Sequence, residues 1–314
     1  MRVRFWMRRA AGGIGAFLLL VGLALPAAAE PLRAVATFSI LADLVRQVGG
    51  THVSVTSLVA PGADAHGYSP APADSRALAQ AQVIVVNGLG FEGWIDRLIR
   101  ASGAKAPVVV ASAGVRSLAG NPEHDHGEGP AHGADHPSEI DPHAWQSVAN
   151  VKTYIANIRA GLAAADPAHA EDYARNADAY TASLDRLEDE IRATIAAIPP
   201  AHRRIITTHD SFGYFSAAYG LAFLAPQGVS TASEASPRDV ARIIRQIRRD
   251  KVPAVFLETI ADPRLMQQIA RESGARIGGK VYSDSLSPPD GPAPTYLDMM
   301  RTNLGAFRAA LGSE

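Results

Sequence analysis

Short apolar runs alternate with helical segments in two separate blocks of this chain, and this alternation restricts its fold more than any other feature. Strand-like runs such as "RAVATFS", "QVIVVNG" and "APVVVAS" are separated by helical stretches before residue 120. "RRIITTH", "AVFLE" and "GKVYSD" are separated in the same way after residue 200. Strands that alternate with helices form βαβ units with parallel strands. We therefore predict two α/β lobes with mainly parallel sheets, formed by residues 30–150 and 201–314.

The segment between the two blocks, residues 151–200, has the pattern of helices. Apolar residues recur in steps of three and four from Tyr173 to Ile195, and Asp166-Pro167 is typical of a helix start. A continuous helix over residues 167–198 would be ~48 Å long. One lobe is too small for such a helix, so we predict that it joins the two lobes. A helical hairpin within one lobe is the alternative that periodicity does not exclude.

The first 29 residues have the composition of an export signal. Four arginines within the first nine residues precede an apolar run at residues 14–25, and "PAAAE" follows. The apolar run is shorter than the ~20 residues that span a bilayer, so we predict a signal peptide that is cleaved after Ala29. The chain contains no cysteine, which excludes disulfides, thiolate ligands and a lipid attached to cysteine. We therefore expect an unlipidated, soluble periplasmic monomer.

The charge of the mature chain gives no support for nucleic-acid binding. Removal of the four leader arginines leaves 26 basic residues against 31 acidic ones, a formal charge of −5 with histidine neutral. A nucleic-acid partner would favour a basic balance instead.

Four residues with metal-binding side chains share one kind of place: each lies in a loop or at the end of a predicted strand. They are His66, His143, His209 and Asp284. Ligands of open α/β sheets collect beyond the carboxyl ends of the strands, and two of the four come from each predicted lobe. Three imidazoles and one carboxylate suit tetrahedral zinc, whereas a manganese site would be richer in oxygen donors. We interpret the remaining histidines outside residues 124–136 as surface or capping residues: His52, His169 and His202.

Several other polar and aromatic residues lie near these positions in the sequence. Asp141 and Asp210 could orient an imidazole from behind, although helix capping is the favoured interpretation for both. Glu258 ends the run "AVFLE" and is not included as a ligand. We expect Trp145 and Phe212 to pack around the site and keep it dry.

An ordered set of stretches from residue 33 to the C-terminus resembles a known family. These stretches are "ATFSILADLV", "PGADAHGYSPAPAD", "VVNGLGFEGW", "DPHAW", "THDSFGYFSAAYGL", "GVSTASEASPRDV" and "VYSDSLS". Together they resemble the metal-binding solute-binding proteins of zinc and manganese ABC importers, the ZnuA/TroA type. "DPHAWQ", "PQGVST" and "YSDSLSPPDGP" are most similar to the zinc-specific AztC-type group of that family.

The resemblance implies a rigid fold with a helix that joins two lobes and with zinc held in the cleft between them. Carried over position by position, the ligands are His66, His143, His209 and Asp284. Manganese members have a glutamate at the position of His209, so the resemblance also favours Zn2+ over Mn2+. Family members often have Asp-Pro-His or Asp-Thr-His where this chain has Asp-Ala-His at 64–66, which leaves the ligand itself intact. The implied partners are a membrane ABC permease and, as a further candidate, a periplasmic zinc chaperone.

A histidine-rich stretch, "HDHGEGPAHGADH", lies just before His143. Its histidines are His124, His126, His132 and His136. Glycine, proline and acidic residues without an apolar face predict a loop over residues 121–140, and a loop that is costly to order is a poor platform for a tight site. Because family members often carry a histidine-rich insertion here, we interpret it as an auxiliary element for zinc capture or transfer. A solvated linker with incidental histidines is the alternative.

Three other functions compete with zinc capture for an importer. A zinc-dependent hydrolase would need an open coordination position, and the chain has no H-E-x-x-H pair. A metallochaperone or adhesin without a transport role fits the same residues. A protein that binds haem or another metal chelate could share two lobes, but three histidines and an aspartate favour a bare ion. We predict that the chain is not an enzyme.

Overall fold

The computed structural model describes residues 1, 30–120 and 140–312. The predicted signal peptide and the four histidines of the histidine-rich stretch therefore lie outside the described residues. Residues from Pro31 onward form one compact unit, and the fold is described for that unit. Within the described residues, no helix is both long and apolar enough to cross a membrane.

The N-terminal lobe contains a four-stranded sheet in which all strands are parallel, in the order β2-β1-β3-β4. Its strands are β1 (Leu32–Ala36), β2 (Val53–Ser57), β3 (Val83–Val86) and β4 (Val108–Val110). The helices between them are α1 (Ser39–Gly49), α2 (Pro72–Gln80) and α3 (Ile95–Ser102). β3 is buried along its whole length because it lies inside the sheet, which explains its uninterrupted apolar sequence.

The C-terminal lobe repeats this arrangement with a second parallel sheet, in the order β10-β9-β7-β8. Its strands are β7 (Arg204–Ile206), β8 (Ala222–Leu224), β9 (Ala254–Glu258) and β10 (Arg276–Val281). The helices are α6 (Gly213–Tyr219), α7 (Pro237–Asp250), α8 (Arg264–Ser273) and α9 (Tyr296–Leu311). Ser236 caps the start of α7, since its Oγ accepts a hydrogen bond from the backbone nitrogen of Asp239 at 3.2 Å.

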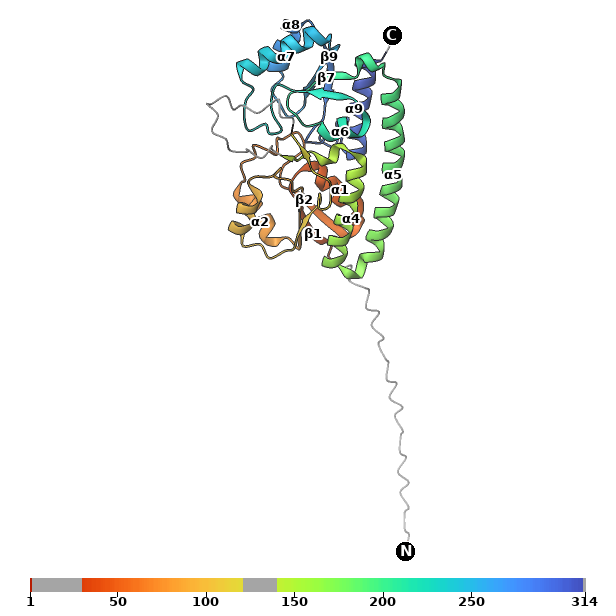
Figure 1. Ribbon diagram of the computed structural model, residues 1–314. Helices are drawn as coiled ribbons and strands as arrows, with labels where there is room; N and C mark the ends of the chain where they lie inside the picture. Colours follow the sequence, from red (N-terminus) through yellow and green to blue (C-terminus); the bar gives the residue numbers. More distant parts are fainter. Residues whose placement is uncertain (2–29, 121–139, 313–314) are drawn as a thin grey trace. The chain divides into compact units, whose positions relative to one another are not determined.

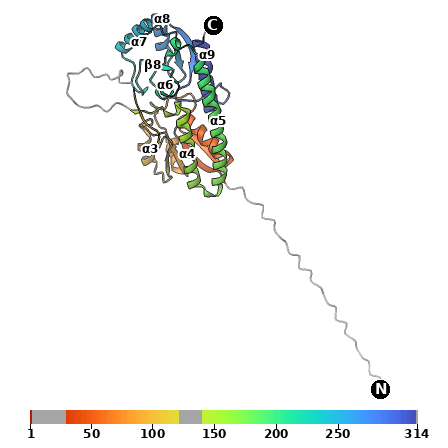
Figure 2. The same cartoon turned by 45° about the vertical axis from the view of Figure 1, so that its right-hand side comes forward.

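α4 (Val148–Ala165) and α5 (Ala170–Ala197) form an antiparallel pair, and α5 joins the lobes. α5 has 28 residues, a length of ~42 Å. It packs against α1 and α4 at one end and against α6 and α9 at the other, and it runs along both lobes in Figure 1 and Figure 2. Two α/β lobes with parallel sheets and a long joining helix are therefore confirmed.

The joining helix begins later than its sequence suggests. Pro167–His169 form a 3-10 turn, and the α-helix starts at Ala170. The carboxylate of Asp166 accepts a hydrogen bond from the hydroxyl of Tyr173 at 2.7 Å and lies 2.6 Å from Nδ1 of His169. These contacts tie the turn to the first helical residues instead of extending the helix to Pro167.

One apolar core is shared by the two lobes. It includes Leu44 of α1, Tyr154 of α4, Leu187 of α5, Phe256 of β9 and Phe307 of α9. A second, smaller cluster lies under α7 and α8 within the C-terminal lobe. The buried apolar contacts therefore continue from one lobe into the other.

Three short strands were not predicted. β8 has three residues, and the antiparallel pair β5 (Leu118–Ala119) and β6 (Ile140–Asp141) has two in each strand. Strands of this length are too short to show alternation in the sequence. The β5–β6 pair matters for the site because it places the chain just ahead of His143.

Candidate metal centre

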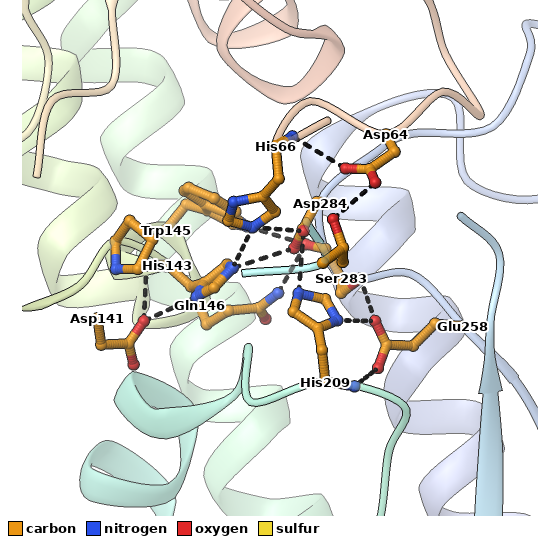
Figure 3. A network of polar contacts seen from close by, with 12 residues as sticks. Asp64, His66, Asp141, His143, Trp145, Gln146, His209, Glu258, Ser283 and Asp284 are labelled. Carbon is orange, nitrogen blue, oxygen red and sulfur yellow. Dashed lines mark hydrogen bonds and ion pairs between the residues drawn. The ribbon is translucent and has the colours of Figure 1, made fainter. Parts of the chain in front are cut away.

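Four side chains converge where the two lobes meet: His66, His143, His209 and Asp284. One potential ligand atom from each lies within 4.8 Å of the others. Figure 3 shows the three rings and the carboxylate facing one another. The structure thus brings together the four residues that the sequence singled out.

The position of each of the four side chains is set by the strand or loop that carries it. His209 and Asp284 lie three residues beyond the ends of β7 and β10, at the carboxyl edge of the same parallel sheet. His143 follows β6 and precedes a 3-10 helix over Ala144–Gln146. His66 lies in the loop between β2 and α2, where its backbone nitrogen donates to Oδ1 of Asp64 at 2.9 Å.

The distances between the facing atoms match the size of a small cation. Nε2 of His66 lies 3.2 Å from Nε2 of His143 and 3.4 Å from Oδ2 of Asp284. Nε2 of His209 lies 3.1 Å from Oδ2 of Asp284, and Nε2 of His143 lies 3.6 Å from its Oδ1. Ligands of a tetrahedral zinc ion at its usual bond lengths are about 3.3–3.4 Å apart. The four donor atoms therefore surround a space suited to one ion.

The site is buried and its polar atoms need a partner. The side chains of His143, His209 and Asp284 are 0% exposed, and that of His66 is 5% exposed. Within the described part of the chain, both carboxylate oxygens of Asp284 and Nε2 of His209 are buried and lack a hydrogen bond of good geometry. Leaving such buried groups unsatisfied costs free energy, and a bound cation would remove that cost.

Carboxylates lie behind two of the three rings. Oδ1 of Asp141 is 2.8 Å from Nδ1 of His143 and also accepts from its backbone nitrogen at 2.9 Å. Oε2 of Glu258 is 2.6 Å from Nδ1 of His209, while its Oε1 accepts from the backbone nitrogen of Thr208 at 2.7 Å. A carboxylate at Nδ1 holds that nitrogen protonated and leaves Nε2 free to bind a metal.

These contacts correct two expectations. Asp141 was expected to cap a helix, but its carboxylate binds the ring and backbone of His143. The alternative role of Asp210, to orient His209, belongs instead to Glu258, whose carboxylate lies at Nδ1 of His209. The signal for Glu258 was available: it ends β9, which lies between the strands that carry His209 and Asp284.

Aromatic side chains cover the N-terminal half of the site. The ring of Phe91 lies edge-on to His66 with centroids 4.6 Å apart, and Trp145 lies 5.2 Å from His143. Trp145 therefore packs around the site as expected. Phe212 does not contribute to this wall, because it stacks on Phe223 at 4.5 Å inside the C-terminal lobe.

A cavity of about 290 Å³ opens beside His66. Phe91, Ile140, Val229 and Ser230 are among the residues that line it. His66 is the one proposed ligand in this lining and also the one with measurable exposure. An ion would therefore reach the buried donors past the ring of His66.

The charges of Asp284, His143 and His209 shift one another's pKa values. Burial disfavours ionisation of Asp284, but the positive charges of His209 and His143 outweigh it and hold the pKa of Asp284 well below its ordinary value. Burial also opposes protonation of His143, yet Asp284 and Asp141 raise the pKa of His143 to about 9. Glu258 and Asp284 likewise raise the pKa of His209 well above its ordinary value, against the effect of burial. Burial dominates at His66 and lowers the pKa of His66.

We expect Glu258→Gln to weaken metal binding about 10–100-fold, the range for groups that orient a ligand. Both carboxylate oxygens of Glu258 face donors, so an amide must turn its NH2 group either toward the backbone nitrogens of Thr208 and His209 or toward Nδ1 of His209. Competition against a chromogenic chelator measures the change. Asp290→Asn removes an exposed carboxylate and serves as the control. An affinity equal to that of the unaltered protein would show that Glu258 does not orient His209.

Two α/β lobes with a buried three-histidine, one-carboxylate site between them define a binding protein for a bare metal cation. Comparison with known proteins gives the family. The family model "Zinc-uptake complex component A periplasmic" (ZnuA) matches residues 34–310, so the chain belongs to the ZnuA family. It is accordingly the extracytoplasmic metal-binding component of an ABC importer, which works with a membrane permease, and it is not an enzyme.

Relatives with different metals in their names match most of this chain. The manganese-binding lipoprotein MntA of Halalkalibacterium halodurans is 34% identical over 282 residues, which cover 90% of this chain and 89% of that protein. The iron-binding protein YfeA of Yersinia pestis is 33% identical over 284 residues, which cover 90% and 88%. The solved structure of the periplasmic zinc-binding protein TroA of Treponema pallidum has a TM-score of 0.80 and 28% identity, and the match covers 90% of this chain and all of that one. Family membership therefore establishes metal binding but leaves the metal to be argued from the site.

Proposed function

We propose that this protein captures Zn2+ outside the cytoplasm and delivers it to an ABC permease, with His66, His143, His209 and Asp284 as ligands. The observation that carries the proposal is the convergence of three Nε2 atoms and one carboxylate within 4.8 Å in a buried site. Four protein ligands leave no coordination position for a substrate, which suits binding and not catalysis. The permease is the partner that would receive the ion.

The donor set supports zinc over the metals named for other relatives. Imidazole nitrogens favour zinc, whereas manganese favours a larger share of oxygen donors. At sites of equal geometry, divalent zinc also binds more tightly than manganese or iron. Assignment to the zinc-specific AztC-type group is part of this proposal and rests on the stretches "DPHAWQ" and "PQGVST".

We further propose that the protein is a free, unlipidated periplasmic monomer. Relatives such as MntA are named lipoproteins, but the 314 residues of this chain include no cysteine to carry a lipid. The mass of the protein recovered from an exporting cell tests this proposal. A mass equal to that of the polypeptide from Glu30 is expected, and an added acyl mass would contradict it.

The histidine-rich stretch is proposed as an auxiliary element. Its position in the sequence supports this role, because the stretch lies between β5 and β6, and β6 leads directly to His143. Its histidines would hold zinc weakly and pass it on. A soluble zinc chaperone remains a candidate partner for the same step.

A chelator-competition titration with Zn2+, Mn2+ and Fe2+ tests the function. The mature protein is compared with a variant that lacks residues 121–137. We expect both to bind one Zn2+ tightly and in preference to the other metals, with additional weak Zn2+ bound to the intact protein alone. Loss of the tight site on deletion would show that the histidine-rich stretch supplies a primary ligand. Preference for Mn2+ or Fe2+ would overturn the assignment of zinc.

The affinity for zinc should rise with pH. The pKa of His143 is raised to about 9, and the pKa of His209 is also raised. Both rings therefore carry a second proton, and a positive charge, in the metal-free protein at neutral pH. Zinc binds only the neutral imidazole rings. Each ring that must lose its second proton therefore makes the apparent affinity rise about tenfold per pH unit below the pKa of that ring. Titration calorimetry in buffers of different ionisation enthalpy measures the protons released. An affinity that does not vary between pH 6 and 8 would contradict the expectation.

The same shift affects the stability of the metal-free protein. A histidine with a raised pKa in the folded state stabilises the fold fully below its ordinary pKa, and this contribution is lost as the pH rises through about 9. The metal-free protein should therefore melt at lower temperature as the pH increases through this range, while the zinc-bound protein should not.

A further inference from the structure

The backbone carbonyl of Ser283 is held by two side chains from the opposite lobe. Nε1 of Trp145 donates to it at 2.9 Å and Nε2 of Gln146 at 2.8 Å. Trp145 and Gln146 begin two residues after His143, and Ser283 directly precedes Asp284 (Figure 3). These two hydrogen bonds therefore connect a ligand of the N-terminal lobe to a ligand of the C-terminal lobe.

The side chain of Ser283 extends the connection to a third ligand. Its hydroxyl donates to Oε2 of Glu258 at 2.7 Å, and the same oxygen lies 2.6 Å from Nδ1 of His209. Ser283 is thus bonded to groups that fix His143, His209 and Asp284.

The chain around Asp284 is also held on its other side. The side-chain amide of Asn303 accepts from the backbone nitrogen of Tyr282 at 2.8 Å and donates to its carbonyl oxygen at 2.7 Å. Within the described residues, by contrast, the carboxylate of Asp284 has polar contacts only with the three proposed ligand rings. The backbone is therefore fixed while the carboxylate stays available to an ion.

We propose that Gln146 and Ser283 are positioning residues that set the metal preference of the site. They hold His143, His209 and Asp284 at the separation that suits a small four-coordinate ion. A looser arrangement would admit ions with longer bonds and more ligands, because selectivity among such metals depends on geometry and rigidity. The inference deepens the proposed function and rests on its four ligands.

Gln146 is suited to a sharp test. Its side chain is fully buried, and its Oε1 has no hydrogen-bond partner among the described residues, so donation by Nε2 to Ser283 is its only polar contact there. Gln146→Met keeps the length of the side chain and removes only that donor. Trp145 continues to bond the carbonyl, so no buried acceptor is left empty.

The experiment measures Zn2+ and Mn2+ affinities of Gln146→Met and Ser283→Ala, together with the visible absorption of their Co2+ forms. Asn157→Leu is the control, because Nδ2 of Asn157 also donates to backbone carbonyls, those of Ala111 at 2.8 Å and Ala113 at 2.9 Å, but outside the metal centre. We expect each of the first two variants to lose about tenfold in Zn2+ affinity and less in Mn2+ affinity, with a changed Co2+ spectrum. Ser283→Thr retains the hydroxyl and should restore the spectrum.

Two outcomes would overturn the proposal. One is an unchanged ratio of Zn2+ to Mn2+ affinity in both variants. The other is an equal change in Asn157→Leu, which would indicate a general loss of stability that the melting temperature would also show. Failure of the proposed function is separate: the unaltered protein would then lack a tight Zn2+ site, or would keep it when Asp284 is replaced.

Discussion

Asp284→Asn is expected to lower the affinity for Zn2+ by more than about 100-fold, beyond the range for groups that only orient a ligand. Asp284 supplies the one carboxylate among the four proposed ligands, and both its oxygens face the imidazoles. Its charge also offsets that of the ion in a site from which water is largely excluded. An amide keeps the shape of the side chain but removes that charge. Chelator competition at neutral pH measures the loss.

The same substitution should change the protonation of the histidines. Asp284 is among the causes that raise the pKa of His143 and of His209 against the effect of burial. Without it, both pKa values should fall, and fewer protons should be released per Zn2+ bound. Asp290→Asn, at an exposed position, controls for the loss of one negative charge. Tight binding that survives in Asp284→Asn would remove this residue from the ligand set.

The architecture followed from local patterns in the sequence. Apolar runs at β3 and β9 predicted parallel strands, and the seven buried positions of α5 are those of its predicted apolar stripe. The short strands β8, β5 and β6 could not be predicted in the same way, because they are defined by their neighbours in the sheet and not by periodicity.

The four candidate ligands could be chosen because parallel strands bring their carboxyl ends together. The residues behind them were harder to rank. Asp141 is adjacent in sequence to several possible partners. Its carboxylate contacts the ring of His143 because of the turn between β6 and the 3-10 helix. Glu258 is 49 residues from His209 and reaches it only because β9 lies beside β7 in the sheet.

The hydrogen bonds from Trp145 and Gln146 to the carbonyl of Ser283 could not be predicted from residue composition or spacing. A backbone acceptor has the same identity at every position, so the sequence does not show which carbonyl Trp145 and Gln146 will bind. Trp145 and Gln146 lie 138 and 137 positions before Ser283 in the sequence, so these contacts depend on the packing of the two lobes. Features of this kind require the three-dimensional structure.

His209→Glu is expected to weaken Zn2+ binding by at least about 100-fold and to shift preference toward Mn2+. The substitution exchanges an imidazole for a carboxylate and makes the donor set two nitrogens and two carboxylates. It also places a third acid next to Asp284 and Glu258, whose carboxylates lie 3.1 Å from Nε2 and 2.6 Å from Nδ1 of His209. Like charges in a buried site repel, so the metal-free variant should be less stable than the unaltered protein.

A second substitution separates the change of donor from the repulsion. Glu258→Gln in the His209→Glu background removes one of the three carboxylates and should restore much of the stability without restoring Zn2+ affinity. Titration of both variants with Zn2+ and Mn2+, beside thermal melts without metal, tests the two effects independently. An unchanged Zn2+ affinity in His209→Glu would remove His209 from the site. Recovery of Zn2+ affinity in the double variant would instead assign the loss to repulsion by Glu258, and selection by imidazole at this position would be wrong.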